Sequence, residues 1–515
     1  MMLAYLLIIT FVSGLLSWLV SRLSVTACRL ISLAGLIIDA VLLVFLWVNH
    51  YSQLLTSENT WIAQVQISWI TPFGISFHLA MDGLSLLLMA LTILLGITSI
   101  VASWNEVKQR VGAFHFTLLA AITGIMGVFT SLDLFLFYFF WELMLVPMFF
   151  IISIWGHENK IYAAVKFFIF TQAGGLLMLV SIIALYFIHG HSTGNFTFDY
   201  SELIKTPCAG AFIIMLGFFI AFAVKLPVVP LHVWLPDAHT EAPTAGSVIL
   251  AGLLLKTGAY GIIRFILPLF SAAAKMLAPA AFVLAIIGIF YGALAAFAQK
   301  DLKRLVAYTS ISHLGFVLLG IFAGNETALQ GAVIITLAHG LSTGALFIII
   351  GALQQRIHTR DMTVMGGLWQ TLPRMGGVTM FFALASLGLP GLANFIGEFL
   401  VLAGTFKVYP WVAAIAALGF IFSAVYSLWI IYRVFQGPLE HPWKVPDLRA
   451  FEMINLGIMM VGIIWIGIFP QTVINTAKTA LNRIQSTVKS TEKIKTIDEE
   501  NNKLFLEPGI KNDDR

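Results

Sequence analysis

The sequence predicts an all-α membrane protein with about fourteen spanning helices and one small external β-hairpin. Hydrophobic residues make up 59% of its 515 residues and charged residues only 10%, whereas soluble proteins carry about 25% charged residues. The apolar residues also form blocks of roughly the 20-residue length that a bilayer-spanning helix needs. These blocks lie at 3–20, 30–49, 83–103, 113–131, 134–154, 164–188, 210–230, 245–268, 278–297, 303–323, 328–352, 376–405, 410–435 and 451–470.

The first block is predicted to remain on the chain as a spanning helix. Met1 to Val20 lacks the basic segment that opens a secretory signal, and the first positive charge is Arg22. An uncleaved span fits this pattern better than a signal peptide does.

Two regions do not have the composition of spans. Residues 61–79 alternate apolar and polar side chains around Thr71-Pro72-Phe73-Gly74, which predicts a β-hairpin outside the membrane. After Pro470 the chain becomes polar and charged. This change predicts an amphipathic helix that grades into a disordered tail.

The basic residues of the loops predict the orientation in the membrane. Fifteen lie on one side and four on the other, and the richer side is expected to be cytoplasmic. Both termini are then periplasmic in a bacterial inner membrane. The cytoplasmic set is Arg22, Arg29, Lys108, Arg110, Lys160, Lys166, Lys300, Lys303, Arg304, Arg356, Arg360, Arg374, Arg433, Lys444 and Arg449, and the other set is Lys205, Arg264, Lys275 and Lys407.

Several kinds of site have no counterpart in the sequence. It has no Walker A loop, dinucleotide-binding glycine fingerprint, iron–sulfur cysteine set or haem-attachment motif. Cys28 and Cys208 do not form a CxxC pair and are expected near opposite membrane faces, which disfavours a disulfide or metal site. We therefore expect no cofactor, no metal and no nucleic-acid partner for this chain.

Seven ionisable residues fall inside the predicted spans. An ionised side chain at the centre of a bilayer costs about 2.5–3.5 kcal/mol, so each one is a candidate for function. Structural hydrogen bonding could be met more cheaply by serine and threonine. The seven are Asp39, Glu142, Lys225, Lys256, His313, His339 and Glu398.

Glu142 and Lys225 are predicted to work as a switch. Burial disfavours the charged form of a lysine, whereas a neighbouring carboxylate favours it. Pro227 and Pro230 interrupt the helix beside Lys225. A pair that opens and closes would therefore change the proton affinity of the lysine, although a purely structural ion pair is the alternative.

Lys256, His313 and His339 are candidates for carrying the proton onward. Two buried lysines cannot both stay charged at low cost, so a proton shared with Lys225 is expected. Histidine titrates near neutral pH, which suits a relay, but a lone buried histidine is often only a packing residue. Metal binding by the histidines is the weaker alternative because no ligand spacing accompanies them.

Glu398 follows a second helix break at Pro390-Gly391. Interrupted helices in both halves of a transporter point to an inverted repeat with its ion path at the breaks. Glu106, at the end of the third span, is interpreted as either an end charge or an auxiliary acid near the same path. Asp82 and Asp133 are expected to be solvated helix caps, and Asp39 has no evident partner.

Three long motifs resemble the antiporter-like membrane subunits of respiratory NADH:quinone oxidoreductase, or complex I. They are the segments 141–148, 225–245 and 308–313. The stretch from Arg356 to Trp369 resembles the M-type subunits in particular, and the likeness extends over nearly the whole chain. In the L- and N-type subunits and the related Mrp cation/proton antiporters, a lysine stands at the position that Glu398 occupies here.

The resemblance implies two inverted five-helix bundles, each with a half-channel. The expected division is 1–112 for the first spans and hairpin, 113–268 and 269–435 for the two bundles, 436–472 for the last span and 473–515 for the tail. Neighbouring L- and N-type subunits and the lateral helix of the L-type subunit are the implied partners. Quinone reduction elsewhere in the complex would drive protons through Glu142, Lys225, Lys256, His313, His339 and Glu398.

Two alternatives remain open at this point. One is a subunit of a stand-alone Mrp-type Na⁺(K⁺)/H⁺ antiporter, which a lysine in place of Glu398 would favour. The other is a passive membrane scaffold, for which Glu142 and Lys225 would be dispensable.

Overall fold

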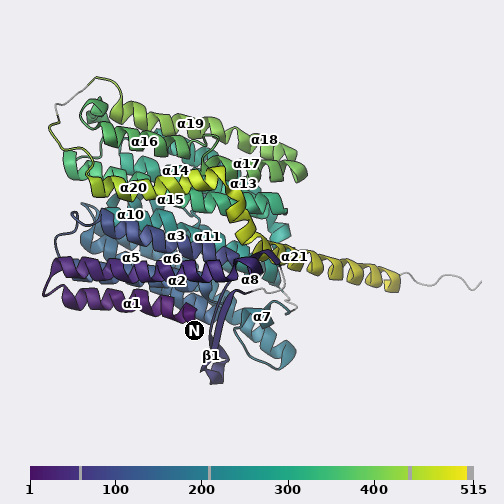
Figure 1. Cartoon of the computed structure of the whole chain (residues 1–515). Coiled ribbons are helices and arrows are strands. Elements are labelled where there is room, and N and C mark those ends of the chain that lie inside the picture. Colours follow the sequence, from purple (N-terminus) through teal and green to yellow (C-terminus); the bar gives the residue numbers. More distant parts are fainter. Residues whose placement is uncertain (57–60, 207–209, 439–442, 507–515) are drawn as a thin grey trace, which may run out of the picture.

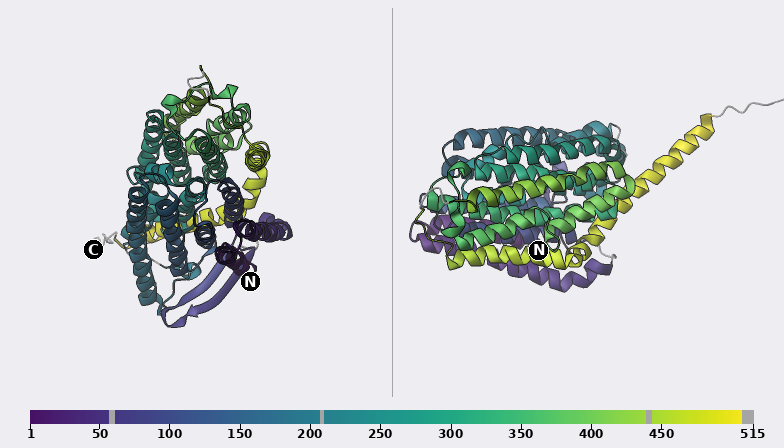
Figure 2. Two further views of the ribbon diagram at one scale, coloured as in Figure 1. Left: turned by 90° about the vertical axis from the view of Figure 1, so that its left-hand side faces the viewer. Right: turned by 90° about the horizontal axis from the view of Figure 1, so that it is seen from above.

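The computed structural model describes residues 1–56, 61–206, 210–438 and 443–506, with side chains described except at 55–56 and 489–506. Most helices run side by side in one bundle, and Figures 1 and 2 show it from three directions. Within the described ranges, twelve helices are long and apolar enough to cross a membrane. The other two of the fourteen predicted spans, 210–230 and 376–405, contain shorter helices that are interrupted by a break. The prediction of about fourteen spans with broken helices therefore agrees with the fold.

The N-terminal part contains three spans and the predicted hairpin. β1 and β2 pair antiparallel, from Ala63 opposite Met81 to Ile70 opposite Ile75, and Gly74 closes the turn with a φ of 66°. The hairpin prediction is therefore confirmed. The elements are α1 (Met2–Val20), α2 (Val25–Thr56), β1 (Ala63–Ile70), η1 (Thr71–Phe73), β2 (Ile75–Met81) and α3 (Gly83–Ala102).

The next elements contain the first broken helix. Helix α8 ends at Lys225 and the chain resumes a helix only at Leu235, because prolines at 227 and 230 cannot supply helical N–H donors. The elements are α4 (Val111–Thr130), α5 (Leu134–Trp155), α6 (Lys160–Thr193), α7 (Tyr200–Leu203), α8 (Ala211–Lys225) and α9 (Leu235–Glu241).

The following span is one continuous helix with two π-helical turns. It runs through α10 (Thr244–Ile249), η2 (Leu250–Leu254), α11 (Leu255–Gly261), η3 (Ile262–Ile266) and α12 (Leu267–Leu269). Such π turns often occur at functional sites, and η2 ends two residues before Lys256.

The second broken helix lies in the C-terminal half, between α16 and α17. The predicted single block 376–405 is divided there by a non-helical break at 387–392. The elements are α13 (Ser271–Phe297), α14 (Leu302–Phe322), α15 (Glu326–Ile357), η4 (Met362–Val364), η5 (Leu368–Gln370), α16 (Pro373–Ser386), α17 (Ala393–Val408), α18 (Pro410–Ala417), α19 (Gly419–Ile430), η6 (Ile431–Phe435), α20 (Ala450–Ile468) and α21 (Pro470–Leu506).

Helix α15 lies in the interior of the bundle, whereas α1, α2, α6, α18 and α20 expose many large apolar side chains. The N-terminus, the hairpin, α7 and the start of α21 gather at one end of the bundle (Figure 1). The segment predicted as an amphipathic helix with a tail is helical as α21 up to Leu506. Residues 507–515 and Cys208 lie outside the described residues.

Candidate functional site

Lys256 and His339 make direct contact in the interior. The Lys256 ammonium, on α11, donates to the Ala251 carbonyl at 2.7 Å and lies 2.5 Å from His339 Nδ1, on α15. Both side chains are completely buried. Because an ammonium has only donors, Nδ1 accepts and the ring proton of a neutral His339 sits on Nε2.

His313 connects this pair to the second helix break. Its ring centre lies 5.7 Å from that of His339. His313 Nδ1 is 2.9 Å from Glu398 Oε1, and its Nε2 is 2.9 Å from the hydroxyl of Tyr426, on α19. With the proton on Nδ1 donated to the carboxylate, Nε2 accepts from the tyrosine. Lys256, His339, His313 and Glu398 therefore form one buried row.

Glu398 lies next to the break between α16 and α17. Gly388 has a φ of +83°, and a Cβ there would lie 3.2 Å from Glu398 Oε2. The glycine therefore supplies both the left-handed backbone and the room beside the carboxylate. Glu398 itself is fully buried.

Lys225 lies at the end of α8, in aromatic surroundings. Its ammonium is 5.5 Å from the centre of the Trp141 ring and 5.3 Å from that of Phe167, distances that permit cation–π attraction. It is fully buried and has no hydrogen-bond partner among the described residues.

The expected direct pair between Glu142 and Lys225 is not formed in this conformation. Lys225 makes no hydrogen bond, and the two groups act on each other only electrostatically. Glu142 is partly buried on α5 and interacts with the side chains of Tyr138 and Gln172. Trp141, next to Glu142 in the chain, presents its ring to the ammonium instead.

Gly175 of α6 leaves the space that the Glu142 carboxylate uses. A Cβ at this position would lie 2.8 Å from Glu142 Oε1. Any larger residue would push the carboxylate away from its present place. This positioning residue was missed from the sequence, since nothing there relates positions 142 and 175.

Glu106 lies just after the end of α3, the third span, as the sequence placed it. It is partly buried and accepts hydrogen bonds from the Thr244 N–H, at 3.0 and 3.2 Å, at the start of α10. Burial raises the pKa of this carboxyl, while the Thr244 bonds and the nearby Lys303 ammonium lower it. Glu106 therefore binds the N-terminus of the helix that begins with α10.

Two further buried polar groups were missed or unexplained. The His239 ring is fully buried and stacks on Phe347 at 4.9 Å, in the electrostatic reach of Lys303 and Lys256. His239 lies in the segment 225–245 that was singled out from the sequence, but no sequence pattern indicated that its ring is buried. Asp39 does have a partner, since the Thr10 hydroxyl of α1 donates to it at 2.5 Å.

Asp82 and Asp133 cap helices as predicted but are not solvated. Asp82 is 4% exposed and pairs with the buried Arg264 at 2.5 Å, and Asp133 is completely buried. Arg264 of η3 covers Asp82, and Ser76 of the hairpin covers Asp133. Among the described residues, no group of three or more His, Cys, Asp or Glu side chains is arranged to hold a metal ion.

Comparison with known proteins places this arrangement in a family. Residues 131–423 match the family described as NADH:quinone oxidoreductase/Mrp antiporter, TM. NADH-quinone oxidoreductase subunit M of Pseudomonas aeruginosa is 51% identical over 496 residues, covering 94% of this chain and 97% of that protein. The Escherichia coli K12 subunit M is 48% identical, with 94% and 98% covered.

Solved structures have the same fold. A chain of respiratory complex I from Thermus thermophilus superposes with a TM-score of 0.84 at 30% identity, covering 95% of this chain and 99% of that one. A chain of the Mrp complex from Dietzia reaches a TM-score of 0.80 at 21% identity, with 98% and 57% covered, and this likeness shows the fold alone. The identity to these subunits M, over nearly the full length of both chains, therefore shows that this chain belongs to the subunit M family of NADH-quinone oxidoreductases.

Proposed function

We propose that this membrane subunit of complex I translocates protons along the row of Lys256, His339, His313 and Glu398, controlled by Glu142 and Lys225. The observation that supports the path is the row of contacts from the Lys256 ammonium to the Glu398 carboxylate. Each member can bind or release a proton, and the Lys256–His339 and His313–Glu398 pairs lie at hydrogen-bond distance. The two histidine rings, 5.7 Å apart between centres, exchange a proton in this proposal through a bridging water molecule.

The unpaired Lys225 supports an electrostatic control step. A lysine without a carboxylate partner in a buried site gives up its proton readily, and approach of Glu142 would reverse that preference. Moving one charge against 100 mV costs about 2.3 kcal/mol. A change of two units in the pKa of Lys225 supplies about 2.7 kcal/mol. The free energy from closing and opening the Glu142–Lys225 pair is therefore large enough to move one charge against 100 mV.

In this proposal the chain carries no redox centre and receives energy from quinone reduction in other subunits. L- and N-type subunits and the lateral helix of the L-type subunit are its neighbours in the membrane. Residues 113–268 and 269–435 act as two inverted half-channel bundles, flanked by the regions 1–112, 436–472 and 473–515. Both termini and the hairpin face the periplasm, in line with the distribution of basic loop residues.

The test replaces Lys256 by methionine, which keeps the length of the side chain and removes the proton-binding amine. Membrane vesicles carrying the variant complex are assayed for NADH oxidation and for ΔpH formation, with subunit levels measured by immunoblot. We expect loss of pumping in a fully assembled complex. Lys407→Met, at an exposed lysine of α17, is the matched control and should pump normally.

Wild-type pumping by an assembled Lys256→Met complex would contradict the path. Pumping that required added Na⁺ or K⁺ would instead favour an Mrp-type cation exchange by this subunit.

A further inference from the structure

Three segments that are far apart in sequence form a small ladder at the hairpin end of the bundle. Leu79 of β2 bridges Ser131, and Asp133 bridges Asp199. The Leu132 N–H donates to the His78 carbonyl, and the Tyr200 N–H donates to the Leu132 carbonyl, each at 2.9 Å. The middle segment is the connection between α4 and α5, and α5 begins at its end.

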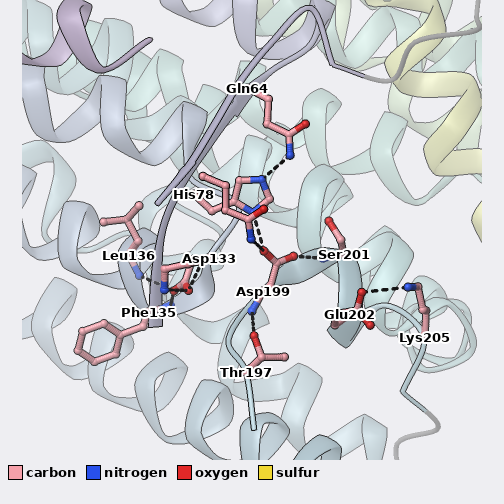
Figure 3. A network of polar contacts seen from close by, with 12 residues as sticks. Gln64, His78, Asp133, Phe135, Leu136, Thr197, Asp199, Ser201, Glu202 and Lys205 are labelled. Atoms are coloured by element: carbon pink, nitrogen blue, oxygen red, sulfur yellow. Dashed lines mark hydrogen bonds and ion pairs between the residues drawn. The ribbon is translucent and has the colours of Figure 1, made fainter. Parts of the chain in front are cut away.

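Side chains reinforce both sides of this ladder. His78 Nδ1 lies 2.5 Å from Asp199 Oδ2, and Gln64 Nε2 lies 2.7 Å from the other ring nitrogen of His78 (Figure 3). His78 is 2% exposed. The His78–Asp199 contact holds the hairpin to the segment that precedes α7.

Asp133 ties the hairpin to the first turn of α5. Its Oδ1 accepts from the N–H groups of Phe135 and Leu136, at 2.9 and 3.1 Å, as a helix N-cap (Figure 3). Its Oδ2 accepts from the N–H and the hydroxyl of Ser76 in β2, at 2.8 and 3.2 Å. One carboxylate therefore performs two separable tasks, one with each oxygen.

Helix α5 carries Glu142 eight positions after Leu134, about 12 Å along the helix axis. Its height and rotation decide how far the carboxylate lies from Lys225. We propose that Asp133 and the His78–Asp199 contact form an external clamp that positions α5, so that Asp133 is a positioning residue for the Glu142–Lys225 step. This inference rests on the proposed function of Glu142.

Asp133→Asn separates the two tasks of the carboxylate. Asparagine is a good N-cap, so its carbonyl oxygen can keep the bonds to α5. Its NH₂ group would then face the N–H of Ser76, and two donors cannot bond to each other. We expect normal assembly and NADH oxidation but proton pumping reduced by about 10- to 100-fold, since a misplacement of about 1 Å at a reacting group has that effect.

A disulfide between hairpin and α4–α5 connection provides the rescue. Leu79 and Ser131 are a non-hydrogen-bonded bridge pair, in which Cα atoms lie about 4.5 Å apart, a separation that a disulfide accepts. Leu79→Cys with Ser131→Cys is introduced into Asp133→Asn, with Cys28 and Cys208 replaced by serine. Oxidation should restore pumping and reduction should abolish it again, which a role of Asp133 as a proton carrier would not produce.

Glu202→Gln, on the same face and outside the ladder, should pump at the wild-type rate. Glu142→Gln run in parallel distinguishes the two possible failures. If Glu142→Gln pumps normally, the proposed function is wrong. If Glu142→Gln fails while Asp133→Asn pumps normally, or while the disulfide gives no rescue, the clamp is overturned.

Discussion

Two buried lysines of this protein lie in contrasting surroundings. Lys256 meets a carbonyl and a histidine nitrogen, whereas Lys225 meets two aromatic rings and no hydrogen-bond acceptor. A lone buried ammonium is costly, so Lys225 is the group whose protonation responds most to a moving carboxylate. This difference assigns control to Lys225 and conduction to Lys256 in the proposed path.

Glu142→Gln keeps the shape of the side chain and removes the charge that acts on Lys225. We expect proton pumping to fall roughly 100-fold, the scale on which a positioned acid–base group contributes, with assembly intact. Lys225→Ala should be equally severe. The measurement is ΔpH formation per NADH oxidised in vesicles, and retention of pumping in both variants would show that the two charges are structural.

Gly175→Ala tests how closely the Glu142 carboxylate must be placed. The added methyl group would lie 2.8 Å from Oε1, so the carboxylate has to shift. We expect pumping to fall by about tenfold, because small displacements of reacting groups are costly. Gly457→Ala, where a Cβ meets no atom within 4 Å, is the matched control. An unchanged rate for Gly175→Ala would mean that Glu142 tolerates displacement.

At the scale of elements, the ionisable residues coincide with irregular helices. Lys225 is the last residue of α8, and Lys256 follows the π-helical turn η2. Glu398 lies in α17, six residues after the break at 387–392. Irregular backbone leaves polar groups without intrahelical partners, and at membrane depth it occurs only where it is buried or lines a path. In η2 the Ala251 carbonyl accepts a hydrogen bond from the Lys256 ammonium.

Gly388→Ala should disturb the second break. A non-glycine residue in the left-handed region costs roughly 1–2 kcal/mol, and the new Cβ would crowd Glu398. We expect lower thermal stability of the complex and slower pumping, measured by a melting assay and by ΔpH formation. Gly377→Ala, in the regular part of α16 with nothing within 4 Å, should leave both unchanged; equal effects of the two would contradict this reasoning.

At the scale of the whole molecule, the N-terminus, the hairpin and the start of α21 lie at one end of the bundle (Figure 1). The row of buried groups links α11, α15, α14 and α17 inside the bundle. The basic loops lie at the opposite end. The proposed orientation therefore makes the clamp an external feature and Glu106 a cytoplasmic one. A proton moving along the row travels from Lys256, on the helix with the π-helical turns, toward Glu398, beside the break between α16 and α17.

Cysteine labelling tests this orientation. Lys205→Cys and Lys108→Cys, both exposed, are made in a background without Cys28 and Cys208. In intact spheroplasts a membrane-impermeant maleimide should label position 205 and leave position 108 unlabelled until the membrane is opened. Labelling in the reverse order would place both termini in the cytoplasm.

The sequence by itself determined the long spans, the hairpin, the two helix breaks and the ionisable residues that fall inside apolar blocks. Hydropathy, alternation and the effects of proline and glycine act over a few residues, so a linear pattern contains them. The six relay candidates could be found from the sequence because an ionisable residue inside an apolar block is recognised without knowing how the helix is rotated.

Only the tertiary structure decided which of these residues touch. The Lys256–His339 and His313–Glu398 contacts join positions 83 and 85 residues apart, and they depend on how each helix is rotated against its neighbours. The same packing left Glu142 and Lys225 without a direct contact and placed Glu106 at the start of α10. It also buried Asp82 beside Arg264 and Asp133 beside the hairpin. Helix rotation is set by many weak side-chain contacts acting together, and no local pattern records their sum.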